Sequence, residues 1–118
     1  MPCSILLVED EARSRRSIAL FLEQESHKVF EAETGEAAVD LIASRNFDTV
    51  ISDFRLPGAI NGIDVLRSQS DKFPGKRLVL ITAFGSEDVQ SAAKALDALY
   101  FEKPISLDEL LSSLHSPS

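Results

Sequence analysis

Carboxylate, hydroxyl and ammonium side chains stand at the ends of several short apolar runs in this chain. Glu9 and Asp10 follow the first such run, Asp53 ends the third, Thr82 follows the fourth and Lys103 follows the fifth. Carboxylates serve as nucleophiles and as ligands of hard cations such as Mg²⁺. An ammonium and a hydroxyl can neutralise the charge on a phosphoryl group in transfer. Brought together, these five side chains would form a magnesium-dependent phosphoryl-accepting site.

Asp53 is the central residue of this set. It closely follows the apolar run 49–51 and precedes the break at Pro57-Gly58. A carboxylate at the end of a buried strand is costly unless its charge is used. Taken singly, Asp53 could be a loop residue that caps a helix, Lys103 could merely neutralise the acids, and Thr82 could merely cap a helix. Their joint position at successive strand ends favours the functional interpretation.

The elements that must position these residues alternate in type along the chain. Apolar runs predict strands at residues 4–8, 27–32, 49–53, 77–81 and 98–101. Apolar spacing and capping signals predict helices at 13–24, 36–44 and about 63–70, one from an N-cap at Ser86 to about 96, and one from Ser106 to about 114. Five strand–helix repeats predict an α/β fold, a doubly wound five-stranded parallel sheet with helices on both faces.

Ligands bind such sheets at the carboxyl ends of the strands. If the first and third strands are neighbours, Glu9, Asp10 and Asp53 crowd one crevice. Two unit charges about 4 Å apart repel each other by roughly 4 kcal/mol at an effective dielectric constant of about 20. The cluster therefore requires a cation, and a ligand set made only of oxygens favours Mg²⁺.

The composition narrows the class of protein. The 118 residues are 44% apolar and 26% charged, as in an ordinary globular domain. A net charge of −7 argues against binding to nucleic acid or anionic membranes, and no apolar run is long enough for a membrane span or a signal peptide. We therefore expect a cytoplasmic protein. Arg13, Arg15 and Arg16 fall on the polar face of the first predicted helix, where we expect a solvated surface or, alternatively, a partner-docking surface.

The motif set resembles the receiver domain of bacterial two-component response regulators, the CheY-like family. The matching motifs are Glu9-Asp10, Asp53-x-x-Leu-Pro-Gly, Thr82-Ala and Tyr100-x-x-Lys-Pro, in this order and each at a strand end. The resemblance covers essentially the whole chain. It implies one receiver domain, residues 1–118, with a flavodoxin-like (βα)₅ fold and the strand order 2-1-3-4-5.

The resemblance also implies roles for the acidic residues. Asp53 would be the phosphoacceptor and a Mg²⁺ ligand, and Asp10 would bind Mg²⁺ directly. Glu9 would contribute mainly through metal-bound water, and the backbone carbonyl of Arg55 would be a further ligand. Glu9 stands where the family more often has aspartate, and the loop from Asp53 to Gly62 is one residue longer than the commonest pattern.

Other positions would bind the phosphoryl group and transmit its presence. Thr82 and Lys103 would bind the phosphoryl oxygens, and the Lys103–Pro104 peptide would be cis. Tyr100 would be the switch aromatic, which turns inward when Thr82 moves toward the phosphoryl group; the alternative is a partly exposed strand residue without a switching role. Arg55 and Phe84 occupy positions that tune dephosphorylation in the family, where a bulky cation and an aromatic ring could shield the acyl phosphate from water.

The implied function is that of a two-component signalling switch. A sensor histidine kinase or a histidine phosphotransfer protein would phosphorylate Asp53, and the face of the fourth helix, fifth strand and fifth helix would then change for an unknown downstream protein, output domain or second copy. Its only catalysis would be self-phosphorylation from phosphodonors and autodephosphorylation. The alternative is a Mg²⁺-dependent aspartyl-phosphate phosphohydrolase. That class requires a second aspartate as general acid at the position where Arg55 stands, and it usually has a cap domain. A flavodoxin-like cofactor binder would need a glycine-rich phosphate loop, which is missing here.

Overall fold

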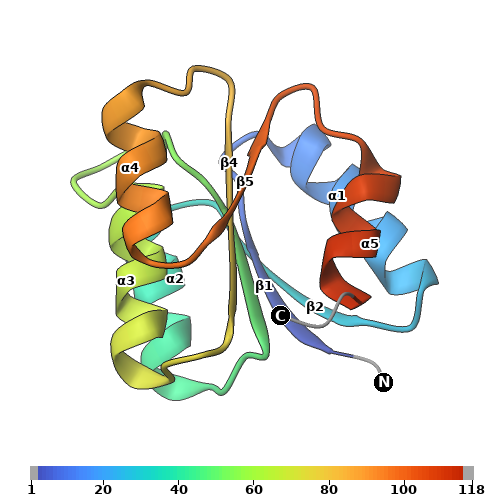
Figure 1. Cartoon of the computed structure of the whole chain (residues 1–118). Coiled ribbons are helices and arrows are strands. Elements are labelled where there is room, and N and C mark those ends of the chain that lie inside the picture. Colours follow the sequence, from blue (N-terminus) through green and yellow to red (C-terminus); the bar gives the residue numbers. More distant parts are fainter. Residues whose placement is uncertain (1–2, 116–118) are drawn as a thin grey trace.

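Strands and helices alternate strictly along the chain in the computed structural model, which describes residues 3–115 (Figure 1). The strands are β1 (Ser4–Val8), β2 (Lys28–Ala32), β3 (Thr49–Asp53), β4 (Arg77–Thr82) and β5 (Leu99–Glu102). The helices are α1 (Ala12–Gln24), α2 (Gly35–Ser44), α3 (Gly62–Lys72), α4 (Glu87–Ala95) and α5 (Leu107–His115). Every predicted element is present, and the ends differ from the predicted ones by at most two residues.

The five strands form one parallel sheet in the order β2-β1-β3-β4-β5. This confirms the doubly wound sheet and its strand order. Because β1 and β3 are direct neighbours, with Val8 opposite Ser52, the residues that follow β1 lie beside the end of β3. The chain thus reverses its winding direction between these two strands, which is where such sheets hold their ligands.

Successive strand residues point to opposite faces of the sheet, and each face is covered by its own helices (Figure 1). Leu6, Val50 and Leu80 belong to the core under α2, α3 and α4. Ile51 and Val79, one residue out of step with them, belong to the core under α1 and α5. Apolar side chains on both faces explain why the central strands are continuous apolar runs.

Side-chain caps define where the helices begin. The hydroxyl oxygens of Ser86 and Ser106 accept hydrogen bonds from the backbone N–H three residues on, which confirms both predicted N-caps. At α3, Asn61 and Asp64 form a reciprocal capping box that the sequence analysis did not predict. It starts the helix at Gly62 rather than Ile63 and ends the long loop that follows Asp53.

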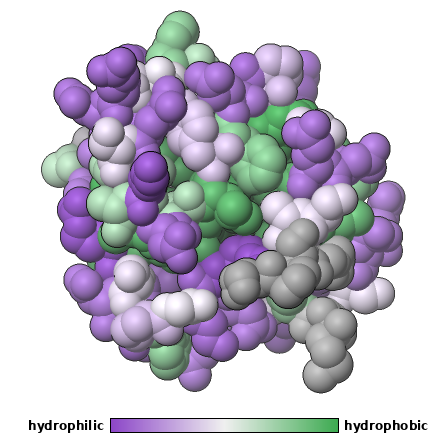
Figure 2. All heavy atoms as spheres, viewed as in Figure 1, coloured by the Kyte–Doolittle hydropathy of each residue, from purple (hydrophilic) through white to green (hydrophobic). Residues whose placement is uncertain are grey.

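Polar side chains cover the outer surfaces of both helical layers, and apolar side chains gather in the band between them (Figure 2). No helix within residues 3–115 combines the length and the apolar character needed to cross a membrane.

Candidate phosphoryl-accepting site

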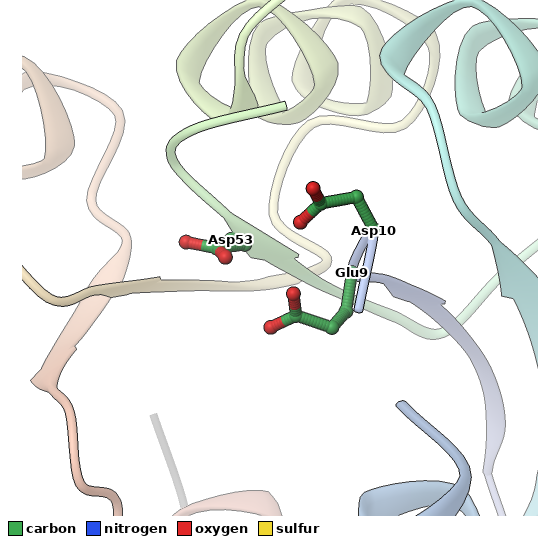
Figure 3. Close-up of side chains that lie close together, drawn as sticks. All are labelled: Glu9, Asp10 and Asp53. Carbon is green, nitrogen blue, oxygen red and sulfur yellow. The ribbon is translucent and has the colours of Figure 1, made fainter. Parts of the chain in front are cut away.

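Three carboxylates converge at the carboxyl ends of β1 and β3 (Figure 3). One oxygen atom from each of Glu9, Asp10 and Asp53 lies within 4.8 Å of the others. Glu9 is only 3% exposed and Asp53 only 7%, whereas Asp10 is exposed. Because the β1–β3 register puts the two strand ends side by side, the sheet itself holds these like charges together.

Lys103 lies between the two buried carboxylates. Its Nζ donates to Oδ2 of Asp53 and to Oε2 of Glu9, each at 2.9 Å. Partial burial tends to lower the pKa of Lys103, but hydrogen bonds and charge attraction from Asp53 and Glu9 outweigh this effect and raise the pKa above its usual value. Lys103 is therefore charged at neutral pH and leaves the three-carboxylate cluster with a net negative charge.

The three carboxylates differ in which oxygens are already bonded. Both oxygens of Glu9 accept hydrogen bonds, Oε1 from the Glu11 amide at 3.1 Å and Oε2 from Lys103. Asp53 accepts one through Oδ2 only, so its Oδ1 has no hydrogen-bond donor within residues 3–115. In the same range, the Asp10 carboxylate has none either. Oδ1 of Asp53 and the carboxylate of Asp10 are therefore the open oxygens of the site.

Backbone hydrogen bonds join the strand ends on one side of Asp53, beginning with the Phe54 amide, which donates to the Ile81 carbonyl at 2.8 Å. Thr82, 1% exposed, ends β4 and accepts from the Lys103 amide through its carbonyl at 2.9 Å. Its hydroxyl oxygen accepts from the Phe84 amide at 3.2 Å, which leaves the hydroxyl proton available for donation. The Lys103–Pro104 peptide is cis. Five predicted site residues, which end or directly follow β1, β3, β4 and β5, thus lie at one end of the sheet.

A family model described as the response regulator receiver domain matches residues 5–115. The chain belongs to the receiver-domain family. Receiver domains accept a phosphoryl group in two-component signalling, and this is the functional class of the chain. The resemblance inferred from the motifs is confirmed, and nothing found in these comparisons favours the phosphohydrolase alternative.

Relatives and solved structures agree with this assignment. Sporulation initiation phosphotransferase F of Bacillus subtilis is 31% identical over 90% of this chain and 86% of its own length. Transcriptional regulatory protein ResD of the same organism is 36% identical, but the alignment spans only 44% of its length. The CheY-like receiver structure from Methanospirillum hungatei superposes with a TM-score of 0.89 at 25% identity, over 97% of this chain and 91% of that one.

The donor set of this receiver suits a hard divalent cation. All three side chains of the cluster offer carboxylate oxygens, two of the groups retain open oxygens, and Lys103 compensates only one of three negative charges. Mg²⁺ favours a few carboxylate ligands and completes its octahedron with water and phosphate oxygens. The receiver family as a whole binds Mg²⁺, and the residues present here fit that ion.

Arg55 and Phe84 lie at the rim of the site. Arg55 is exposed, and its guanidinium carbon lies 5.5 Å from the centre of the Phe84 ring. Phe84 is 72% exposed, which is unusual for a phenylalanine side chain. The two residues stand two positions after Asp53 and two after Thr82, so their contact joins the segments that follow β3 and β4.

Tyr100, on β5, lies against the loop between β4 and α4. Its hydroxyl donates to Oε2 of Glu102 at 3.3 Å, and a Cβ added to Gly85 would lie 1.4 Å from the hydroxyl oxygen. Only glycine at position 85 leaves room for the ring in this orientation. Burial, the Glu102 charge and this hydrogen bond together raise the pKa of the Tyr100 phenol above 10.0.

The sequence analysis misjudged Arg15. Its side chain is only 14% exposed; Nε pairs with Glu31 at 3.1 Å, and a terminal nitrogen donates to the Glu9 carbonyl at 2.8 Å. Arg16 also pairs with Glu31. The expectation of a solvated arginine face is therefore wrong for Arg15. Arg15 and Glu31 are sixteen residues apart and lie on different elements, so the only signal in the sequence is that their charges are opposite.

Proposed function

We propose that Asp53 is the phosphoacceptor of this receiver. The observation that carries this proposal is the state of its two oxygens: Oδ2 is bonded to Lys103, and Oδ1 has no donor within residues 3–115. A buried carboxylate with one anchored and one open oxygen is oriented for attack on an incoming phosphorus atom. Asp10 also has open oxygens, but it is exposed and lacks the lysine contact.

The phosphoryl donor is a phosphohistidine of a sensor histidine kinase or a histidine phosphotransfer protein. Oδ1 of Asp53 attacks phosphorus; the O–P bond forms as the donor P–N bond breaks, and the electron pair remains on the imidazole nitrogen, which takes up a proton. The ammonium of Lys103 and the hydroxyl of Thr82 donate to the phosphoryl oxygens. The available Thr82 proton and the short Lys103 contacts support these roles.

Asp10, Asp53 and the backbone carbonyl of Arg55 would hold Mg²⁺ directly, and Glu9 would contribute mainly through water. Hydrogen bonding supports this division, because both oxygens of Glu9 already accept hydrogen bonds from protein donors. When bound, Mg²⁺ neutralises charge on the transferred phosphoryl group. The protein supplies the other groups of the site by holding the ends of β1, β3, β4 and β5 side by side.

Phosphorylation then acts on the face formed by α4, β5 and α5. Thr82 moves toward the phosphoryl group, and Tyr100 leaves its contact with Glu102 and turns inward. The remodelled face binds a downstream protein, an output domain or a second copy of the receiver. Residues 1–118 constitute one receiver domain, which acts in the cytoplasm. Its net charge of −7 disfavours direct contact with nucleic acid or membranes. Its own catalysis is limited to accepting and hydrolysing the phosphoryl group.

Intact-mass spectrometry after incubation with a small acyl-phosphate donor tests this proposal. We expect the mass of one phosphoryl group to be added in Mg²⁺ and not in EDTA. Asp53→Asn should abolish the addition, and Asp71→Asn, which changes an exposed carboxylate of α3, should leave it unchanged. Full phosphorylation of Asp53→Asn, or equal phosphorylation in EDTA, would refute the assigned chemistry.

A further inference from the structure

Arg15 is a largely buried cation to which the proposed phosphoryl chemistry gives no role. One terminal nitrogen donates to the backbone carbonyl of Glu9 at 2.8 Å, and Nε pairs with Oε1 of Glu31 at 3.1 Å. The side chain therefore connects α1, the end of β1 and strand β2. A buried guanidinium with two fixed acceptors in different elements holds those elements at a defined separation.

Every polar group of Glu9 is bonded. Its amide donates to the Ala32 carbonyl at 3.1 Å, its carbonyl accepts from Arg15, and its carboxylate accepts from the Glu11 amide and from Lys103. Arg15 supplies the contact to the carbonyl. That carbonyl belongs to the planar peptide unit that also contains the amide nitrogen of Asp10.

Asp10 lacks such support of its own. Within residues 3–115 its carboxylate has no hydrogen-bond donor, and the residue is exposed. The direction of its side chain is therefore set by the backbone that carries it. Fixing the Glu9–Asp10 peptide plane fixes the position of Cα of Asp10, the atom that carries the side chain, and so limits where that carboxylate lies relative to Asp53 (Figure 3).

We propose that Arg15 is a positioning residue for the metal site: it holds the Glu9–Asp10 peptide so that the open carboxylate of Asp10 faces Asp53, and Glu31 holds Arg15 in place. This inference rests on the proposed binding of Mg²⁺ by the carboxylate cluster. It assigns Arg15 no contact with the ion or the phosphoryl group.

Removing Arg15 has opposite expected effects on Mg²⁺ affinity depending on whether the residue acts only through its charge or positions the ligands, which makes the positioning role testable. A positive side chain beside a cation site opposes cation binding, so removing it without moving any ligand would raise the affinity for Mg²⁺. If Arg15 positions the ligands, removing it lowers the affinity even though the site becomes more negative. The sign of the change therefore distinguishes positioning from a bystander charge.

The test is the dissociation constant of Mg²⁺, measured by isothermal titration calorimetry on the unphosphorylated chain. We expect Arg15→Met to weaken binding by about 10-fold or more, the usual effect of removing a residue that supports a metal ligand. Arg15→Lys, which keeps a single donor, should fall between this variant and the wild type. Arg16→Met is the matched control, because Arg16 also pairs with Glu31 but does not contact Glu9; its affinity should be unchanged or slightly higher.

A second readout does not depend on the metal. The Asp10 amide shares a peptide unit with the Glu9 carbonyl, so its NMR chemical shift in metal-free protein should move in Arg15→Met and stay in place in Arg16→Met. If Arg15→Met does not fold, Arg15→Gln provides the same loss of charge with a polar side chain. Wild-type protein that binds no Mg²⁺ would refute the proposed metal site, and this inference with it. Wild-type protein that binds Mg²⁺, beside a folded Arg15→Met variant that binds it equally or more tightly, would overturn the inference alone.

Discussion

The ammonium nitrogen of Lys103 lies 2.9 Å from Oδ2 of Asp53, across a separation of fifty residues in the sequence. The same nitrogen lies 2.9 Å from Oε2 of Glu9. Two carboxylates that are more than nine-tenths buried thus share one cation. Lys103 offsets part of the repulsion between carboxylates that the sheet holds together, and the proposed Mg²⁺ site would share these carboxylates with the lysine.

Replacing Lys103 should therefore expose the repulsion within the cluster. We expect Lys103→Met to lower the free energy of unfolding in EDTA by about 1–3 kcal/mol, because Asp53 and Glu9 lose their shared donor. Mg²⁺ should then raise the melting temperature of the variant more than that of the wild type, since the metal supplies the missing positive charge. Lys94→Met, on the exposed side of α4, is the control. Equal metal-induced shifts in all three proteins would show that Lys103 does not balance the metal ligands.

Tyr100 gives a direct optical probe of the proposed switch, because the chain has one tyrosine and no tryptophan. Burial and Glu102 raise the pKa of its phenol above 10.0. We expect an ultraviolet titration of the phenolate to have its midpoint above that value. Glu102→Gln should lower the midpoint part of the way, since it removes the neighbouring charge but not the burial.

The raised pKa of the Tyr100 phenol also determines the direction in which folding stability changes with pH. A raised pKa means that the folded chain holds the phenol proton more tightly than the unfolded chain does. The resulting stabilisation is full below the unfolded value near 10 and is lost as the pH rises through the folded value. The loss should be smaller in Glu102→Gln than in the wild type. A phenol midpoint identical in the two proteins would contradict the Tyr100–Glu102 contact.

Gly62 allows the first turn of α3 to approach the backbone of Asp53. A Cβ at this position would lie 2.2 Å from the Asp53 carbonyl oxygen and 2.8 Å from Cα of Phe54. Both are backbone atoms, which cannot move without displacing the end of β3. We expect Gly62→Ala to cost about 1–3 kcal/mol of unfolding free energy and to weaken Mg²⁺ binding, whereas Ser70→Ala on the same helix should do neither. Wild-type stability and metal affinity in Gly62→Ala would contradict this packing.

The order of elements, the sheet topology and the meeting of five site residues were predictable, because apolar periodicity and strand ends are local signals. Other features depend on the reach of side chains between distant elements. The burial of Arg15 depends on where Glu31 stands on β2, and the space that Gly85 leaves is seen only once Tyr100 lies against it. Polar residues on a helix surface look alike in sequence whether they meet solvent or a partly buried carboxylate on another element.

Arg55 and Phe84 are expected to set the lifetime of the acyl phosphate. The guanidinium of Arg55 lies 5.5 Å from the centre of the Phe84 ring, and we expect this pair to limit the approach of water to the acyl phosphate. We expect the Arg55→Ala, Phe84→Ala double variant to lose its phosphoryl group several-fold faster than the wild type, as measured by intact mass after removal of the donor. Arg67→Ala, a change to an exposed arginine of α3, should leave the rate unchanged. An acyl phosphate that hydrolyses at the wild-type rate in the double variant would remove this shielding role.

The identity of the phosphorylated atom is the central claim, and reductive mapping tests it most directly. Borohydride reduces an aspartyl phosphate to homoserine but leaves free carboxylates intact. After phosphorylation in Mg²⁺, reduction and digestion, tandem mass spectrometry should find homoserine at position 53 and aspartate at position 10. Homoserine at position 10, or a phosphorylated chain in which no residue is reduced, would contradict the assignment of Asp53 as the phosphoacceptor.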